Sequence, residues 1–162
     1  MVGLLDNKRN TPPAEVDKLF DAGIAYMQSE EYAFAYYCFD RTGKTDIQTL
    51  YNKALCCHYI GWLSECRILL KEMERLFPSG TDGRLRELPE PFVRWEKERT
   101  SALCPMPHEA PFPVAAIQML LLKAENAYGM QLYGEVRNVA ACLGGEYRRI
   151  DELLKTIDDD HV

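Results

Sequence analysis

The chain has 162 residues, of which 47% are hydrophobic, and its formal net charge is −6 at pH 7. A chain of this size and apolar content can bury enough surface to fold alone, so the sequence predicts a single domain over residues 1–162. The negative charge and the lack of a basic stripe disfavour nucleic acids and anionic membranes as partners, because both bind basic surfaces.

The hydropathy of the chain indicates a soluble protein. Residues 1–13 contain no long apolar run after a basic start, so we expect no secretory signal. The longest apolar stretch, residues 114–122, is interrupted by Gln118 and is shorter than the roughly 18–20 residues that a membrane span needs. We therefore predict a cytoplasmic location.

After a polar lead that ends at Pro12 and Pro13, two similar stretches follow each other about 31 residues apart. Each has apolar residues at helical spacing, a break, and a second helical segment. In the first stretch Thr11 can cap the first helix and Gly43 ends the second; in the second stretch Asp46 and Ser64 can cap the helices, and Gly61 forms the turn. The predicted helices are 14–28, 32–41, 47–60 and 63–77.

Residues 79–113 differ in composition from the rest of the chain. Six prolines prevent this segment from forming two packed helices, although its length is close to one repeat. We predict one short helix over residues 90–102 and an extended segment over 103–112, held at the surface. An insertion of this length within a compact domain is commonly functional.

A third hairpin follows the insertion. Its predicted helices cover residues 114–130 and 133–143, and Gly144 and Gly145 end the second of them. A last helix over residues 146–157 has apolar side chains on one face and charged side chains on the other. This pattern is typical of the helix that caps the end of a repeat array.

Six cysteines and three histidines give no convincing reactive site. Five cysteines lie in predicted helices, where free Cys acts as a small buried apolar residue. The contiguous Cys56, Cys57 and His58 point in different directions around a helix and do not suit zinc. Cys104 and His108 share the Pro-rich segment, but they lack a third group to orient them. Since catalytic motifs are also absent, we predict no enzyme, metal or cofactor.

The three hairpins resemble tetratricopeptide repeats, with units at about 14–43, 46–78 and 114–143. In that family small residues let antiparallel helices approach, aromatic residues fill the adjacent holes, and Gly or Pro sets the turns. Cys66 stands where Ala is usual, and the first unit lacks the closing Pro. The matching residues are Gly23, Tyr26, Tyr32, Ala35 and Phe39; Tyr51, Asn52, Ala54, Gly61, Glu65, Leu70 and Pro78; and, more weakly, Ala124, Glu125, Tyr128, Tyr133, Glu135 and Leu143.

The resemblance implies an all-α, right-handed α-hairpin solenoid with a concave groove lined by the first helix of each unit. Members that bind acidic carboxyl termini have Lys and Asn where this chain has Phe20 and Ile24, so we do not expect that specificity. An apolar, aromatic lining suits an extended or helical peptide. The implied groove residues are Phe20, Ile24, Met27, Tyr51, Asn52, Leu55, His58, Tyr59, Gln118, Leu121, Glu125 and Tyr128.

The sequence therefore favours a protein-interaction module or scaffold that binds a peptide or protein. Two alternatives remain: a self-assembling, homodimeric repeat protein, because imperfect repeat ends expose apolar surface, and a protein like the repeat chaperones of bacterial secretion. Within the insertion, Phe92 and Trp95 are the predicted anchors, and they could hold it across the groove as a built-in ligand.

Overall fold

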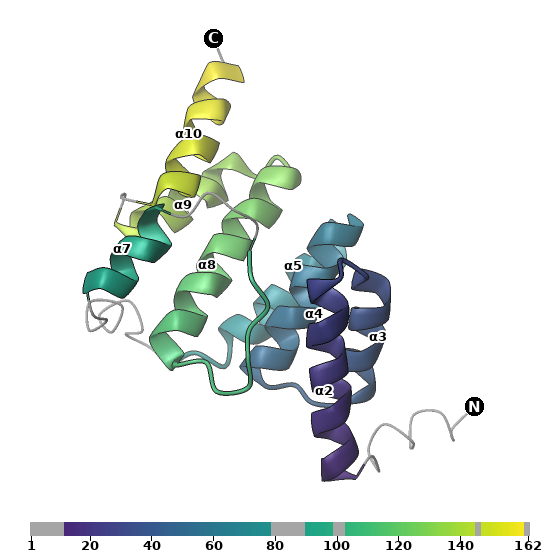
Figure 1. The fold of residues 1–162 in the computed structure, drawn as a ribbon. Coiled ribbons are helices and arrows are strands. Elements are labelled where there is room, and N and C mark those ends of the chain that lie inside the picture. The colour runs from purple at the N-terminus through teal and green to yellow at the C-terminus, as the bar shows by residue number, and fades with distance from the viewer. Residues whose placement is uncertain (1–11, 79–89, 99–102, 145–146, 161–162) are drawn as a thin grey trace. The chain divides into compact units, whose positions relative to one another are not determined.

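The computed structural model describes residues 12–78, 90–98, 103–144 and 147–160 (Figure 1). All regular structure in these ranges is helical, with no strand, which confirms the predicted all-α class for this part of the chain. The chain divides into two compact units. The N-terminal unit contains Met1–Leu76 and Pro105–Glu109, and the C-terminal unit contains Phe77–Cys104 and Ala110–Val162.

The N-terminal unit consists of the first two predicted hairpins. Helix α3 packs on both α2 and α4, and α4 packs on α5. The predicted bounds are confirmed for α3 and α4. Helix α5 was predicted to end at residue 77 but ends at Glu74. The helices are α2 (Pro13–Gln28), α3 (Tyr32–Arg41), α4 (Ile47–Ile60) and α5 (Leu63–Glu74).

Two of the predicted end signals are confirmed in α4. The side chain of Asp46 accepts a hydrogen bond of 2.8 Å from the backbone N–H of Thr49, and Gly61 ends the helix with a φ of 94°. Ser64 is not a cap: α5 begins after Trp62, and no side chain caps it. Thr11 lies outside the described residues.

Close packing of α2 on α3 depends on a glycine. A Cβ atom at Gly23 would lie 2.6 Å from Cζ of Phe39, which is fully buried. The Phe39 ring meets the Phe20 ring edge-on, with centroids 5.3 Å apart. The expected role of a small residue at position 23, letting two helices approach, is confirmed.

The C-terminal unit contains the predicted third hairpin and two further helices. Helix α8 (Phe112–Gly129) packs on α9 (Tyr133–Leu143), and α10 (Arg148–Asp160) contacts α7 (Glu90–Glu98), α8 and α9. The bounds of α9 are as predicted, and Gly144 ends it with a φ of 83°. Residues 99–102, where the helix containing α7 was expected to end, lie outside the described residues.

Two helices of the C-terminal unit differ at their ends from the prediction. Helix α8 begins at Phe112, before the predicted residue 114, because Pro113 is tolerated in a first helical turn. Helix α10 continues to Asp160. Its predicted apolar face is confirmed, since Ile150, Leu153 and Ile157 are buried.

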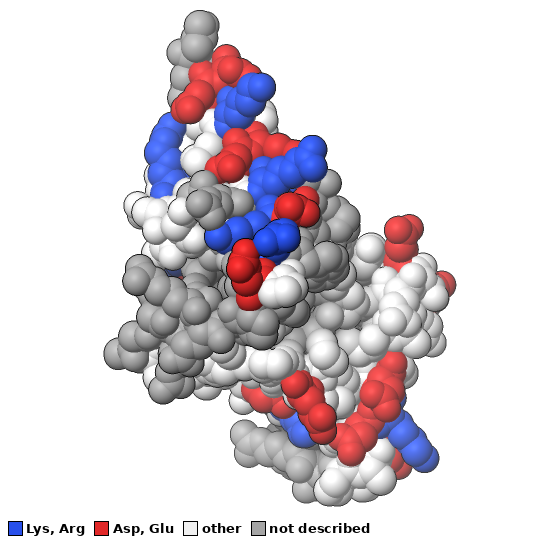
Figure 2. Space-filling model, turned by 60° about the vertical axis from the view of Figure 1, so that its left-hand side comes forward, with Lys and Arg blue, Asp and Glu red and all other residues white. Residues whose placement is uncertain are grey.

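The surface charges are mixed. On the face drawn in Figure 2, basic side chains lie among acidic ones, for example over α10 at the top of the view. Within the described ranges, no helix is long and apolar enough to cross a bilayer.

Candidate functional site

A short piece of the insertion belongs to the N-terminal unit. The segment Pro105–Glu109, which we call the strap, lies in this unit although its neighbours in the sequence belong to the other. Its first three residues have no helical structure, and a turn follows at His108 and Glu109. Figure 1 shows it as part of the green trace that passes beside α4 and α2.

The amide of Asn52, on α4, holds the strap by its backbone. Its Nδ2 donates a hydrogen bond of 2.8 Å to the carbonyl oxygen of Met106, and its Oδ1 accepts one of 2.7 Å from the N–H of Met106. Both residues are fully buried. One side chain therefore pairs both backbone groups of one residue, as a neighbouring strand would. Such a contact recognises an extended backbone, whatever side chain that residue carries.

A second contact fixes the strap two residues later. The ring of His108 lies over the ring of Phe20, on α2, with centroids 3.6 Å apart and planes 30° apart. Met106 is buried against Asn52, whereas His108 contacts Phe20 from an exposed position at the start of the turn, and Pro107 between them is exposed as well. We call the surface formed by Phe20 and Asn52 the α2/α4 face.

The composition of the strap favours an extended conformation. Proline fixes its own φ and disfavours helical geometry in the residue before it, so Pro105 and Pro107 hold Met106 close to an extended conformation. Prolines also lack an N–H group that would need a partner on burial. The strap therefore loses little conformational freedom when it docks.

The other groove residues predicted in the N-terminal unit differ in exposure. Tyr51, Leu55 and Met27 are buried, whereas Ile24 and His58 are partly exposed. The ring of Tyr59 stacks on that of Tyr32, the first residue of α3, with centroids 4.6 Å apart. Of the predicted set, the structure brings Phe20 and Asn52 together at the strap.

The groove residues predicted in the C-terminal unit all lie on α8. Gln118 and Leu121 are buried. The ring of Tyr128 packs near that of Tyr133, across the hairpin turn, with centroids 6.1 Å apart. The carboxylate of Glu125 forms an ion pair with a residue of the same unit.

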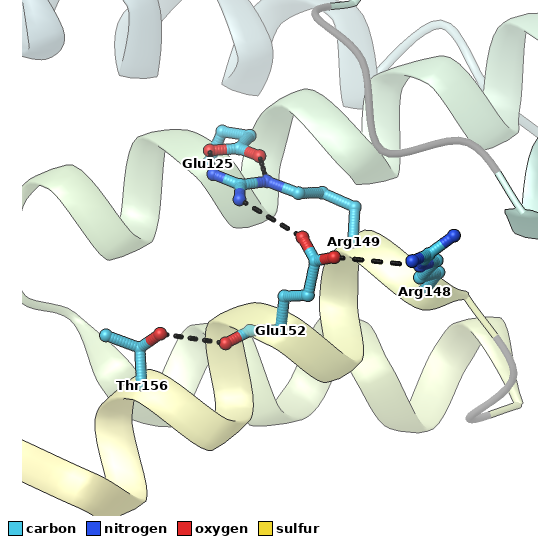
Figure 3. Close-up of polar contacts among 5 residues, drawn as sticks. All are labelled: Glu125, Arg148, Arg149, Glu152 and Thr156. Atoms are coloured by element: carbon cyan, nitrogen blue, oxygen red, sulfur yellow. Dashed lines mark hydrogen bonds and ion pairs between the residues drawn. The ribbon is translucent and has the colours of Figure 1, made fainter.

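Glu125 forms an ion pair with Arg149 of α10, shown in Figure 3. Arg149 donates hydrogen bonds to both carboxylate oxygens, through Nε to Oε1 and, at 3.1 Å, through Nη2 to Oε2. Glu152 extends the network, 3.6 Å from Nη1 of Arg149 and 3.8 Å from Nε of Arg148. The hydrogen bonds to Glu125 raise the pKa of Arg149 above its ordinary value. This network fastens α10 to α8.

Breaking this network should cost modest stability. Arg149→Ala is expected to lower the free energy of unfolding by about 1 kcal/mol, because the pair is two-pronged but only partly buried. Arg148→Ala is the matched control. Its guanidinium is exposed and, among the described residues, its ion pair is the long contact to Glu152, so we expect a change within about 0.5 kcal/mol. Urea unfolding followed by circular dichroism measures both, and equal losses would contradict the assignment.

The strap contains residues that sequence reasoning did not select. Met106 carried no signal beyond its place in a segment predicted to be extended, and His108 was considered only as a partner of Cys104. The predicted anchors Phe92 and Trp95 lie on α7, but their side chains are outside the described residues. Two prolines around one apolar residue, in an extended segment, could have indicated a docked segment.

Most cysteines are buried, as predicted, and burial makes their thiols unreactive. Burial raises the pKa of Cys57 to about 11 and that of Cys66 to about 12, and it also raises the pKa of Cys56. Their thiols stay protonated and unreactive at neutral pH. Cys142 is exposed, which corrects its prediction as a buried helical residue, and Cys104 is exposed as well. The described residues contain no group of three or more His, Cys, Asp or Glu side chains placed to hold a metal ion.

This burial predicts which thiols react. In the folded chain, Cys104 and Cys142 should react readily with a thiol reagent such as Ellman's reagent, whereas the buried Cys38, Cys56 and Cys66 should react only after unfolding. Mass spectrometry after brief alkylation identifies the modified positions, with urea-unfolded protein as the control. Rapid native labelling of Cys56 or Cys66 would contradict the structure.

The same thiols should make stability depend on pH. The pKa of a cysteine in the unfolded chain is about 9.0, whereas burial raises the pKa of Cys57 to about 11 and that of Cys66 to about 12. Above about pH 9 the unfolded chain therefore binds fewer protons, and each thiol lowers the free energy of unfolding by up to about 1.4 kcal/mol per pH unit. Below about pH 8 these thiols contribute no pH dependence.

Urea unfolding at about pH 8, 9 and 10 measures this decline. The double variant Cys57→Ala/Cys66→Ala is the control and should show a flatter profile, because alanine has no proton to lose. If both chains gave the same slope, the thiols would not be its source.

Comparison of the chain with known protein families, with curated proteins and with solved structures finds no match.

Proposed function

We propose that the chain is a protein-interaction module, a right-handed α-hairpin solenoid of the tetratricopeptide type, whose α2/α4 face binds an extended segment of a partner protein. The observation that carries the proposal is the pairing of Asn52 with both backbone groups of Met106. A buried amide used in this way serves to hold a chain segment. An extended partner segment would form the same two bonds in place of the strap.

The surroundings of Asn52 support this reading. A face that recognises a backbone needs a second contact for specificity, and Phe20 provides an aromatic ring for it. The mixed charges in Figure 2 favour a protein over a nucleic acid as the partner, because nucleic acids bind to basic surfaces.

Selection from a library of random displayed peptides tests the proposal. The selection is run on the full-length native chain and on Met106→Asp, in which a buried carboxylate should drive the strap off the α2/α4 face. Affinities of selected peptides are then measured for Asn52→Leu and for Asn138→Leu, the same exchange at an exposed position of α9. We expect Asn52→Leu to weaken binding at least about tenfold and Asn138→Leu to leave it unchanged. If the selected peptides bound Asn52→Leu as tightly as the native chain, the proposal would be overturned.

Self-association is a second candidate, favoured by exposed apolar side chains on the N-terminal unit. Phe34 and Tyr37 of α3 and Ile68 of α5 are each more than half exposed, and so is Trp62 just before α5. Large exposed apolar side chains mark an interface where they form a contiguous patch. Sedimentation of the native chain and of Phe34→Asp separates the candidates: a dimer that the substitution dissociates would support self-assembly.

A further inference from the structure

The strap has the properties of a bound ligand that is covalently part of the protein. It is short, its first three residues have no helical structure, and its neighbours on both sides in the sequence belong to the other unit. Its only buried residue is Met106, which also makes both hydrogen bonds to Asn52. The groups that would recognise a partner segment are thus already occupied in this structure.

We propose that the strap mimics a segment of the partner and occupies the α2/α4 face until that segment displaces it. The chemistry of the strap therefore indicates the chemistry of the partner segment. The proposal rests on the proposed function. The partner segment is extended, carries methionine or a side chain of similar unbranched apolar shape, and has an aromatic or imidazole ring two residues later.

The contacts explain each element of this signature. Asn52 requires a residue with a free N–H group and an extended backbone, which excludes proline at the Met106 position. Full burial of Met106 requires an apolar side chain, since a charged one would lose its hydration without a partner. The ring of His108 lies over the ring of Phe20 with the two planes tilted by 30°, so another planar ring at that position could replace it.

Competition follows from the shared contacts. A partner and the strap cannot both pair with Asn52, because its amide has one such donor and acceptor edge. A partner can bind only those molecules from which the strap has left. The apparent affinity of the native chain is therefore the affinity of the vacant face multiplied by the fraction of such molecules. The rigid, Pro-flanked strap makes this fraction small, since docking it costs little conformational entropy.

The test measures binding of the strap sequence supplied as a separate peptide. The probe is a fluorescein-labelled peptide of residues 103–111 with Cys104→Ser, and polarisation is read on full-length chains. We expect the peptide to bind Met106→Asp at least about tenfold more tightly than the native chain, because the competing strap has been released. Adding Asn52→Leu to Met106→Asp should abolish this gain.

Peptide variants test the signature. In the peptide, Met106→Asp should remove binding and His108→Ala should weaken it several-fold, whereas norleucine, an unbranched apolar residue, in place of Met106 should preserve it. Circular dichroism checks that Met106→Asp remains helical. If it does not, Met106→Ala releases the strap more mildly and the same comparison applies.

The possible outcomes distinguish a failure of this inference from a failure of the proposed function on which it rests. Equal binding of the peptide to native and released chains would show that the strap does not compete, and would overturn the inference. If the peptide bound neither chain while library peptides bound through Asn52, the inference would fall and the proposed function would stand. If the strap peptide bound but no library peptide did, the face would serve only its own strap, and both would fall.

Discussion

Replacing Asn52 by leucine is expected to lower the free energy of unfolding by about 2–4 kcal/mol. Leucine is close to asparagine in size but can neither donate to the carbonyl oxygen of Met106 nor accept from its N–H. Each backbone group left buried without a partner costs about 1–3 kcal/mol. The strap can avoid this cost by leaving the face, but it then exposes the Met106 side chain, which is worth about 1.5–3 kcal/mol when buried.

Two measurements distinguish strap release from general damage. Urea unfolding gives the loss of stability, and hydrogen exchange by NMR follows the Met106 amide, which should be protected in the native chain and exchange rapidly in Asn52→Leu. The same exchange at exposed Asn138 is the control, with an expected change within about 0.5 kcal/mol. A Met106 amide that stayed protected in Asn52→Leu would contradict the assigned contact.

Helix positions could be predicted from the sequence wherever the ends carry strong chemical signals. Asp46 and Gly61 bound α4, and Gly144 ends α9, and the predicted limits of both helices are confirmed. The end of α5 was wrong because Leu76 and Phe77 continue the apolar period beyond Glu74 without a terminating glycine. Phe77 packs instead against Phe112, with ring centroids 4.8 Å apart. Apolar periodicity reports which face is buried, not where a helix stops.

Only part of the candidate site could be predicted from the sequence. Asn52 and Phe20 could be singled out because the resemblance places them on the first helices of their units. Their partners could not, since Met106 is 54 positions from Asn52 and no periodicity relates the two. The insertion was expected to act through Phe92 and Trp95, the largest apolar side chains available. Those two side chains lie outside the described residues, so that prediction stands untested; the contacts seen at the strap were instead signalled by proline spacing, which favours an extended segment before it docks.

Substitution of Gly23 by alanine should destabilise the N-terminal unit by about 1–3 kcal/mol. Alanine favours helix over glycine by up to about 1 kcal/mol, so propensity alone would predict the opposite sign. The added Cβ would lie 2.6 to 2.9 Å from three atoms of the Phe39 ring. That ring cannot retreat freely, because it is fully buried and meets the ring of Phe20. Steric overlap therefore outweighs the gain in helix propensity.

Gly134→Ala is the matched control for Gly23→Ala. Gly134 also lies within a helix, α9, but nothing stands within 4 Å of where its Cβ would be. Here propensity acts alone, and alanine should stabilise the chain by about 0.5–1 kcal/mol. Urea unfolding of both variants should thus give changes of opposite sign. Adding Phe39→Leu to Gly23→Ala should recover part of the loss, and additive effects would contradict a clash between these two positions.

A shift of Phe39 would also reach the α2/α4 face. Phe39 contacts Phe20, and Phe20 supports the ring of His108, so the overlap at Gly23 acts on the strap through two aromatic contacts. Gly23→Ala should therefore speed exchange of the Met106 amide beyond what its loss of global stability explains, while Gly134→Ala should not. The packing of the first hairpin and the hold on the strap would then be one continuous structure, in which Phe20 serves both the core and the site.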